Sequence, residues 1–172
     1  RQAGMNINNG DASNTIAIGL NAGIDITSGQ RNLLIGTEAG TNISTSDDNT
    51  AIGYNAMHGN DSTAGTGTGR NTGIGSSVLY AITTGTQNTA IGTSAASAIT
   101  TGHDNIAIGH NALLTEDTGA KNVAIGTEAL KVFNHDGNGL NTAVGYRAGY
   151  DLISGTSNIF VGAYAGENIT TS

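Results

Sequence analysis

The chain has 172 residues, of which 27 are glycine and none is proline, cysteine or tryptophan, and its net charge at pH 7 is −7. The lack of cysteine excludes a disulfide scaffold, a thiolate zinc site and a cysteine nucleophile. Six basic residues in an acidic chain argue against nucleic-acid binding, and no apolar run approaches the ~20 residues of a membrane-spanning helix.

Residues 1–13 contain no copy of the repeat that fills the remainder of the chain, so we expect an N-terminal lead-in or partial coil there. From residue 14 to residue 172 the phrase Asn-x-x-Ile-Gly recurs nine times at a nearly constant interval of about 17 residues, which predicts a repeat architecture. Its glycines are Gly19, Gly36, Gly53, Gly75, Gly92, Gly109, Gly126, Gly145 and Gly162.

A unit of about 17 residues is too short for a pair of helices and suits one coil of a solenoid. We therefore predict an all-β fold, a parallel β-solenoid (β-roll) of about nine such coils. Each coil is expected to hold two short strands, one over Thr-Ala-Ile-Gly and one around Ile-Thr-Thr. Glycine and asparagine, which tolerate positive φ angles, mark the turns between them.

Stacking places equal positions of successive coils in rows about 4.8 Å apart. The isoleucine before each anchor glycine, such as Ile91, is expected to point inward as a buried aliphatic row. The asparagine four residues before the glycine, such as Asn88, is expected to form a ladder of amide groups. The core between these rows is thin, which favours association with other copies, most simply three rolls side by side.

Two insertions, near residues 57–70 and 130–140, interrupt the regular spacing, and irregular loops usually carry function. Tyrosines directly after an anchor glycine are candidate platforms for sugar stacking, although packing in the turn explains them equally well. The candidate contacts to a receptor or glycan are Tyr54, His58, Asp61, Arg70, His135, Asp136 and Tyr146.

The sequence offers no catalytic constellation, and we do not expect an enzyme. Carboxylates such as Glu38, Glu116 and Glu128 are expected at solvated turns. Residues 134–139 partly resemble a calcium loop but lack the distal glutamate, so calcium is a minor hypothesis and no other cofactor or metal is expected.

A row of threonine and serine nine residues after the anchor glycines, which His135 interrupts, is similar to the hydroxyl arrays of ice-binding proteins. The neighbouring row is interrupted by aspartate and isoleucine, for example Asp117 and Ile153, which spoils a regular array. Hydroxyl groups that satisfy the backbone of a turn explain the pattern better.

The segments Asn-Thr-Ala-Ile-Gly-Thr-Ser-Ala at 88–95 and Asn-Ile-Ala-Ile-Gly-His-Asn-Ala at 105–112 resemble the head repeats of trimeric autotransporter adhesins, the YadA-like head. Similar repeats occur in bacteriophage tail fibres. The resemblance implies a left-handed roll, three copies packed into a trimer, and an adhesive or shaft role. The adhesin repeat is usually shorter than this one and often has serine where this chain has alanine, and both departures favour the tail-fibre type.

We therefore expect a structural or adhesive segment of a fibre that is extracellular, on a cell surface or on a virion. Its expected partners are further copies of itself as a homotrimer, and a glycan or protein receptor on a host surface. Because no polar capping unit is apparent near residue 172, an alternative is a subunit that stacks end to end into an extracellular filament.

Overall fold

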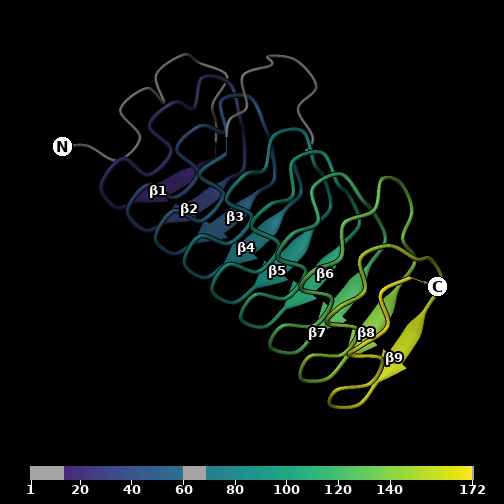
Figure 1. Cartoon of the computed structure of the whole chain (residues 1–172). Coiled ribbons are helices and arrows are strands. Elements are labelled where there is room, and N and C mark those ends of the chain that lie inside the picture. Colours follow the sequence, from purple (N-terminus) through teal and green to yellow (C-terminus); the bar gives the residue numbers. More distant parts are fainter. Residues whose placement is uncertain (1–13, 60–68, 172) are drawn as a thin grey trace.

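The computed structural model describes residues 14–59 and 69–171, and all regular structure in these residues is β-strand. The predicted lead-in at residues 1–13 lies outside them. Nine short strands follow one another, namely β1 (Ile16–Ile18), β2 (Leu33–Ile35), β3 (Thr50–Ile52), β4 (Thr72–Ile74), β5 (Thr89–Ile91), β6 (Ile106–Ile108), β7 (Val123–Ile125), β8 (Thr142–Val144) and β9 (Ile159–Val161). Each strand pairs in parallel with the next, so the strands form one sheet in sequence order. Figure 1 shows them stacked along one side of the roll, which confirms the parallel β-solenoid.

The register of the sheet is the same at every step, including the steps that span the insertions. Ile52 of β3 pairs with Ile74 of β4 although the first insertion lies between them, just as Ile91 pairs with Ile108 across a coil of regular length. The extra residues therefore leave the strand and its neighbours in place.

The prediction of a second strand in each coil is wrong. The Ile-Thr-Thr segments contact the next coil through shared carbonyl groups: the oxygen of Asp117 accepts the N–H groups of Thr100, Thr101 and Gly102. A backbone that directs three successive N–H groups to one oxygen curves into a turn and cannot form a regular ladder. In the described ranges, two isolated bridges, Ala120 with Asn138 and Ser154 with Thr171, are the remaining β-pairing outside the nine strands.

The isoleucine row points outward, which contradicts the expected buried aliphatic row. In β5 the middle residue Ala90 is 0% exposed, whereas Ile91 is 37% exposed. Side chains alternate between the faces of a strand, so in a three-residue strand the first and third share one face and the middle residue takes the other.

The inner face of the sheet carries mainly small residues, because other side chains already fill the interior behind the strand. A Cβ atom added at Gly73 of β4 would lie 3.1 Å from Met57 Cε and 3.2 Å from Val78 Cγ1.

Two positions of each coil supply side chains to the interior: the middle residue of the strand and the fourth residue after the anchor glycine. In most coils one of the two is large and the other is small. Where the strand contributes the large Leu34, the flanking fourth positions are Gly23 and Gly40, and a Cβ atom at either would collide with Leu34. Where the strand contributes alanine or glycine, the fourth position is mostly larger, as at Leu113 and Leu130. Large and small residues are thus complementary at these two positions in most coils, as dense packing favours, whereas the coil of β5 has the small Ala90 and Ala96.

The anchor glycine marks the closest approach between coils. Gly92 has a φ angle of 127°, and a Cβ atom there would lie 2.7 Å from the carbonyl oxygen of Gly109 in the next coil. No real Cβ atom approaches a carbonyl oxygen so closely, so glycine is the residue that this position accepts.

The asparagine row forms the buried amide ladder that the sequence predicts. The side-chain amide of Asn88 donates to Asn71 Oδ1 at 3.1 Å and to the carbonyl oxygen of Gly102 at 2.8 Å. Its own Oδ1 accepts the backbone N–H and the side-chain amide of Asn105, both at 3.1 Å. The side chain thus uses its two donors and both lone pairs of its oxygen while it is buried.

We expect Asn88→Asp to destabilise the fold by at least about 3 kcal/mol, because a carboxylate of the same size supplies no donor and buries a charge. Chemical denaturation of the variant measures the change. Gln87→Glu is the matched control, because it makes the same chemical change at the exposed neighbouring residue. Equal stability losses in the two variants would mean that the amide ladder is unimportant.

We expect Gly92→Ala to lower the melting temperature much more than Gly162→Ala does. Both glycines have φ angles near 125°, so backbone strain is similar, but nothing lies within 4 Å of a Cβ atom at Gly162. The difference between the two variants isolates the collision between coils, which we expect to cost about 3 kcal/mol. A difference near zero in calorimetric melts would contradict the close approach.

Candidate functional site

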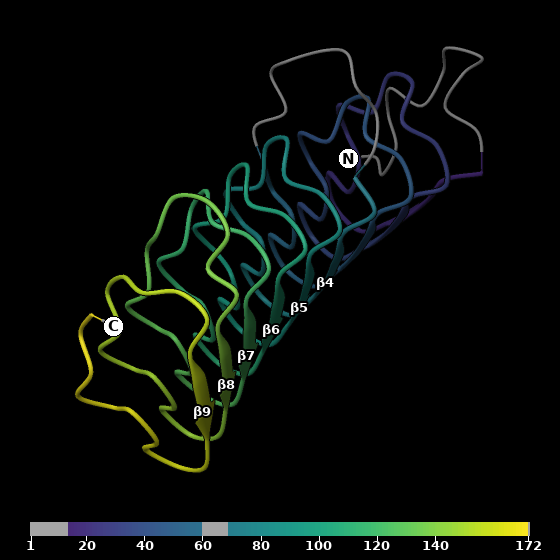
Figure 2. The same ribbon diagram turned by 90° about the vertical axis from the view of Figure 1, so that its right-hand side faces the viewer.

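The outer face of the sheet is an exposed apolar surface. The third residue of every strand is isoleucine or valine and points outward, and the first residue, also outward, is threonine in β3, β4, β5 and β8 and aliphatic elsewhere. Among the most exposed members are Ile16, Ile18, Ile74, Ile91, Ile106, Ile159 and Val161. In Figure 2 the later strands, β4 to β9, line up along one side of the roll. Parallel sheets are usually covered on both faces, so this face, hereafter the outer sheet face, is the largest candidate surface of the roll.

The structure separates the candidates around the first insertion. Tyr54 follows the anchor glycine after β3 and is 56% exposed. His58, on the same coil, stacks on Tyr80 with 5.1 Å between ring centroids, and its Nε2 lies 3.9 Å from a carboxylate oxygen of Glu38. Arg70 is exposed and lies just before β4. Asp61 lies outside the described residues.

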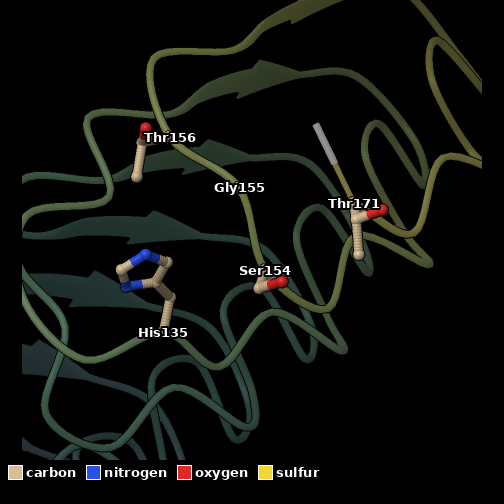
Figure 3. Close-up of a pocket in the computed structure, with 5 residues that line it drawn as sticks. All are labelled: His135, Ser154, Gly155, Thr156 and Thr171. Carbon is tan, nitrogen blue, oxygen red and sulfur yellow. The ribbon is translucent and has the colours of Figure 1, made fainter.

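The second insertion places His135 and Asp136 on the surface beside an open hollow of about 440 Å³. The imidazole of His135 stacks on Phe133, and a carboxylate oxygen of Asp136 accepts the hydroxyl hydrogen of Thr118 at 2.6 Å. Figure 3 shows His135 with the other residues around the hollow, which are Ser154, Gly155, Thr156 and Thr171. The hollow offers hydroxyl groups and one imidazole ring, but its lining contains no carboxylate.

Glu116 holds this loop from inside the roll, a role that the sequence did not suggest. We expected a solvated turn carboxylate, but Glu116 is 0% exposed and occupies the inner row that carries Ile99 and Phe133 in the adjacent coils. Its two carboxylate oxygens accept the N–H of Gly119 at 2.6 Å and the N–H of His135 at 3.2 Å. Burial raises the pKa of the Glu116 carboxyl group, and these two hydrogen bonds oppose part of that effect. The signal in the sequence is that Glu116, like Asn60, interrupts a row of apolar residues seven positions after each anchor glycine.

A network of charged side chains connects the turns that follow β7, β8 and β9. The guanidinium of Arg147 lies 2.8 Å from a carboxylate oxygen of Glu167 and 3.4 Å from one of Glu128, and it stacks 3.9 Å above the ring centroid of Tyr150. Lys131 donates to the other oxygen of Glu128 at 2.7 Å. The hydrogen bond from Lys131 lowers the pKa of Glu128. We call these five residues the Arg147 network. Glu128 and Arg147 stand two residues after their anchor glycines, and Lys131, Tyr150 and Glu167 stand five residues after theirs. The residue type changes from coil to coil at both positions, so the recurring pattern of the repeat does not reveal these contacts.

Tyr146 lies beside this network and contacts a second tyrosine. Its ring and that of Tyr164 are nearly perpendicular, at 84°, with 5.2 Å between centroids. Tyr146 is 45% exposed and Tyr164 is 54% exposed. Of the predicted contact residues, Tyr146 is therefore the one that the structure places in an exposed aromatic pair.

Hydroxyl groups of the threonine rows satisfy the backbone of the neighbouring coil. The Oγ1 atoms of Thr27, Thr83 and Thr100, which stand eight residues after their glycines, each donate to a carbonyl oxygen of the next coil. These three residues belong to the adjacent row, so the interpretation given for the row nine residues after each glycine stays a prediction.

No three histidine or acidic side chains gather closely enough to hold a metal ion in the ranges that the structure describes. The residues of the suspected calcium loop, 134–139, lie within those ranges. The described segments also contain no helix long and apolar enough to cross a membrane.

No protein family model, curated protein or solved structure matches this chain.

We expect the stability of the protein to fall as the pH rises from about 4.5 through the raised pKa of Glu116. The folded state binds this proton more tightly than the unfolded chain does, so the contribution is complete at low pH and is lost on ionisation. Denaturation midpoints of Glu116→Gln between pH 4 and pH 8 should lack this decline. Glu128→Gln is the control of opposite sign, because the pKa of Glu128 is lowered. Identical pH profiles for wild type and Glu116→Gln would contradict the expectation.

Proposed function

We propose that the chain is a structural and adhesive β-solenoid segment of an extracellular or virion fibre, and that three copies associate in parallel through the outer sheet face. The observation that carries this proposal is the unbroken row of nine aliphatic side chains that point away from the core. Burial of such a row in an interface would stabilise the assembly by about 25 cal/mol for each Å² of apolar surface removed from water.

A copy of the same chain is the partner that fits this surface best. The outward rows repeat at the coil spacing of ~4.8 Å, and a second copy has rows with the same spacing. Three narrow sheets facing one axis would enclose all the rows and leave no open apolar face. The resemblance to trimeric adhesin heads and tail fibres supports the number three.

The rest of the roll suits a stiff spacer. Continuous backbone pairing runs from β1 to β9, and the buried amide ladder connects every coil from Asn32 to Asn158. The exposed loops and turns, which include His135 and Tyr146, are then the surfaces available to a receptor. An extracellular or virion location belongs to this proposal through the resemblance.

The association is tested by light-scattering mass over a hundredfold range of concentration. We expect the wild-type mass to equal three chains throughout, and Ile91→Asp to convert the protein to single chains that keep the wild-type circular dichroism. Thr93→Asp is the matched control, since Thr93 is exposed beyond the end of the same strand. Ala90→Asp, one residue earlier, should instead unfold the roll, because Ala90 points into the core.

A wild-type mass of one chain at every concentration would overturn the association, as would an unchanged mass in Ile91→Asp. A mass that grows with concentration would favour the alternative, a filament that stacks end to end.

A further inference from the structure

The Tyr146–Tyr164 pair forms an exposed corner on the turns after β8 and β9. Two perpendicular rings offer one flat face and one ring edge, and about half of each side chain is open to solvent. Neither phenolic hydroxyl has a hydrogen-bond partner in the segments that the structure describes. Such a corner suits a ligand that has an apolar face and hydroxyl groups at its rim, and a pyranose ring has both.

The corner is built on a rigid support. The neighbouring residue of Tyr146 is Arg147, whose guanidinium is held between Glu128 and Glu167 and against the ring of Tyr150. These contacts join three successive coils and so connect the turn of Tyr146 to the turn of Tyr164. A preorganised surface loses less entropy when it binds a ligand.

The charges of the Arg147 network decide which class of sugar fits. It contains two cations, Arg147 and Lys131, and each is already paired with a carboxylate of Glu128 or Glu167. An acidic sugar would therefore find no unpaired cation here and would meet carboxylates. Glu167 lies on the same turn as Tyr164, because its backbone N–H donates to the carbonyl oxygen of Tyr164 at 3.1 Å. Arg147 contacts one of its carboxylate oxygens, and the other can accept a hydrogen bond from a sugar hydroxyl.

From this geometry we propose that Tyr146 and Tyr164, with Glu167, form a binding site for a neutral saccharide. One pyranose ring stacks on a tyrosine face, the second ring limits its position, and Glu167 accepts one of its hydroxyl hydrogens. The inference rests on the adhesive part of the proposed function and names its ligand class.

The test is an NMR titration of the intact chain with maltotetraose, mannotetraose and N-acetylchitotetraose as neutral probes and sialyllactose as the acidic one. We expect at least one neutral probe to bind in the millimolar range, and Tyr146→Ser and Tyr164→Ser each to weaken that binding about tenfold or more. Tyr146→Phe keeps the ring and should retain most of the affinity. Tyr54→Ser is the matched control, because Tyr54 is an exposed tyrosine at the same repeat position as Tyr146 and has no ring contact within the described segments.

Three results would overturn the proposal: no neutral probe binds, sialyllactose binds more tightly than every neutral probe, or Tyr54→Ser weakens binding as much as Tyr146→Ser. The light-scattering mass of Tyr146→Ser is measured in parallel. A change in that mass would assign the tyrosines to self-association and would also overturn the site. If the wild-type protein binds a neutral probe while its light-scattering mass equals one chain, the result supports the saccharide site and contradicts the proposed trimer.

Discussion

The rest of the structure depends on the spacing between neighbouring coils, which the parallel hydrogen bonds of three-residue strands set. At this spacing the anchor glycine touches the carbonyl group of the next coil, and the asparagine amide reaches the amide of its neighbour. Both contacts tolerate one residue type, so glycine recurs at every anchor and asparagine at nearly every ladder position. The stack thus gains its cohesion from hydrogen bonds that each coil supplies to the next, together with the apolar side chains buried inside the roll.

The narrow interior has a consequence for function. Because the inner face of each strand accommodates mainly alanine, the larger aliphatic residues of the strands are placed outside, where they form the outer sheet face. A single roll leaves this face in water, and association with further copies would cover it. In the proposed fibre, the turns and loops away from the sheet would remain free for contact with a ligand. Among them is the Tyr146–Tyr164 corner, on the turns that the Arg147 network connects.

The period, the parallel pairing and the amide ladder could be predicted from the sequence, because each is a property of one position repeated nine times. The direction of the isoleucine row could not be predicted, because hydrophobicity alone does not distinguish a side chain that faces the core from one on the outer face of the strand. Alternation within Thr-Ala-Ile allowed both choices, and the contacts of Met57 and Val78 behind the strand decide between them. Glu116 contacts an unlike position of the adjacent coil, and the Arg147 network joins side chains of different chemistry at repeat positions where the residue type changes from coil to coil. A comparison of equal positions does not reveal such contacts, although the break at Glu116 was visible.

The central claim is that buried asparagine amides hold the coils together, and hydrogen exchange of the side-chain amides tests it most directly. NMR can follow the Nδ2 hydrogens of Asn71, Asn88 and Asn105 alongside those of Asn111, which lies in a turn. The account predicts that the three ladder amides exchange as slowly as the backbone amides of the strands, and far more slowly than the turn amide. Ladder amides that exchange as fast as Asn111 would contradict it, because the ladder would then open without unfolding of the roll.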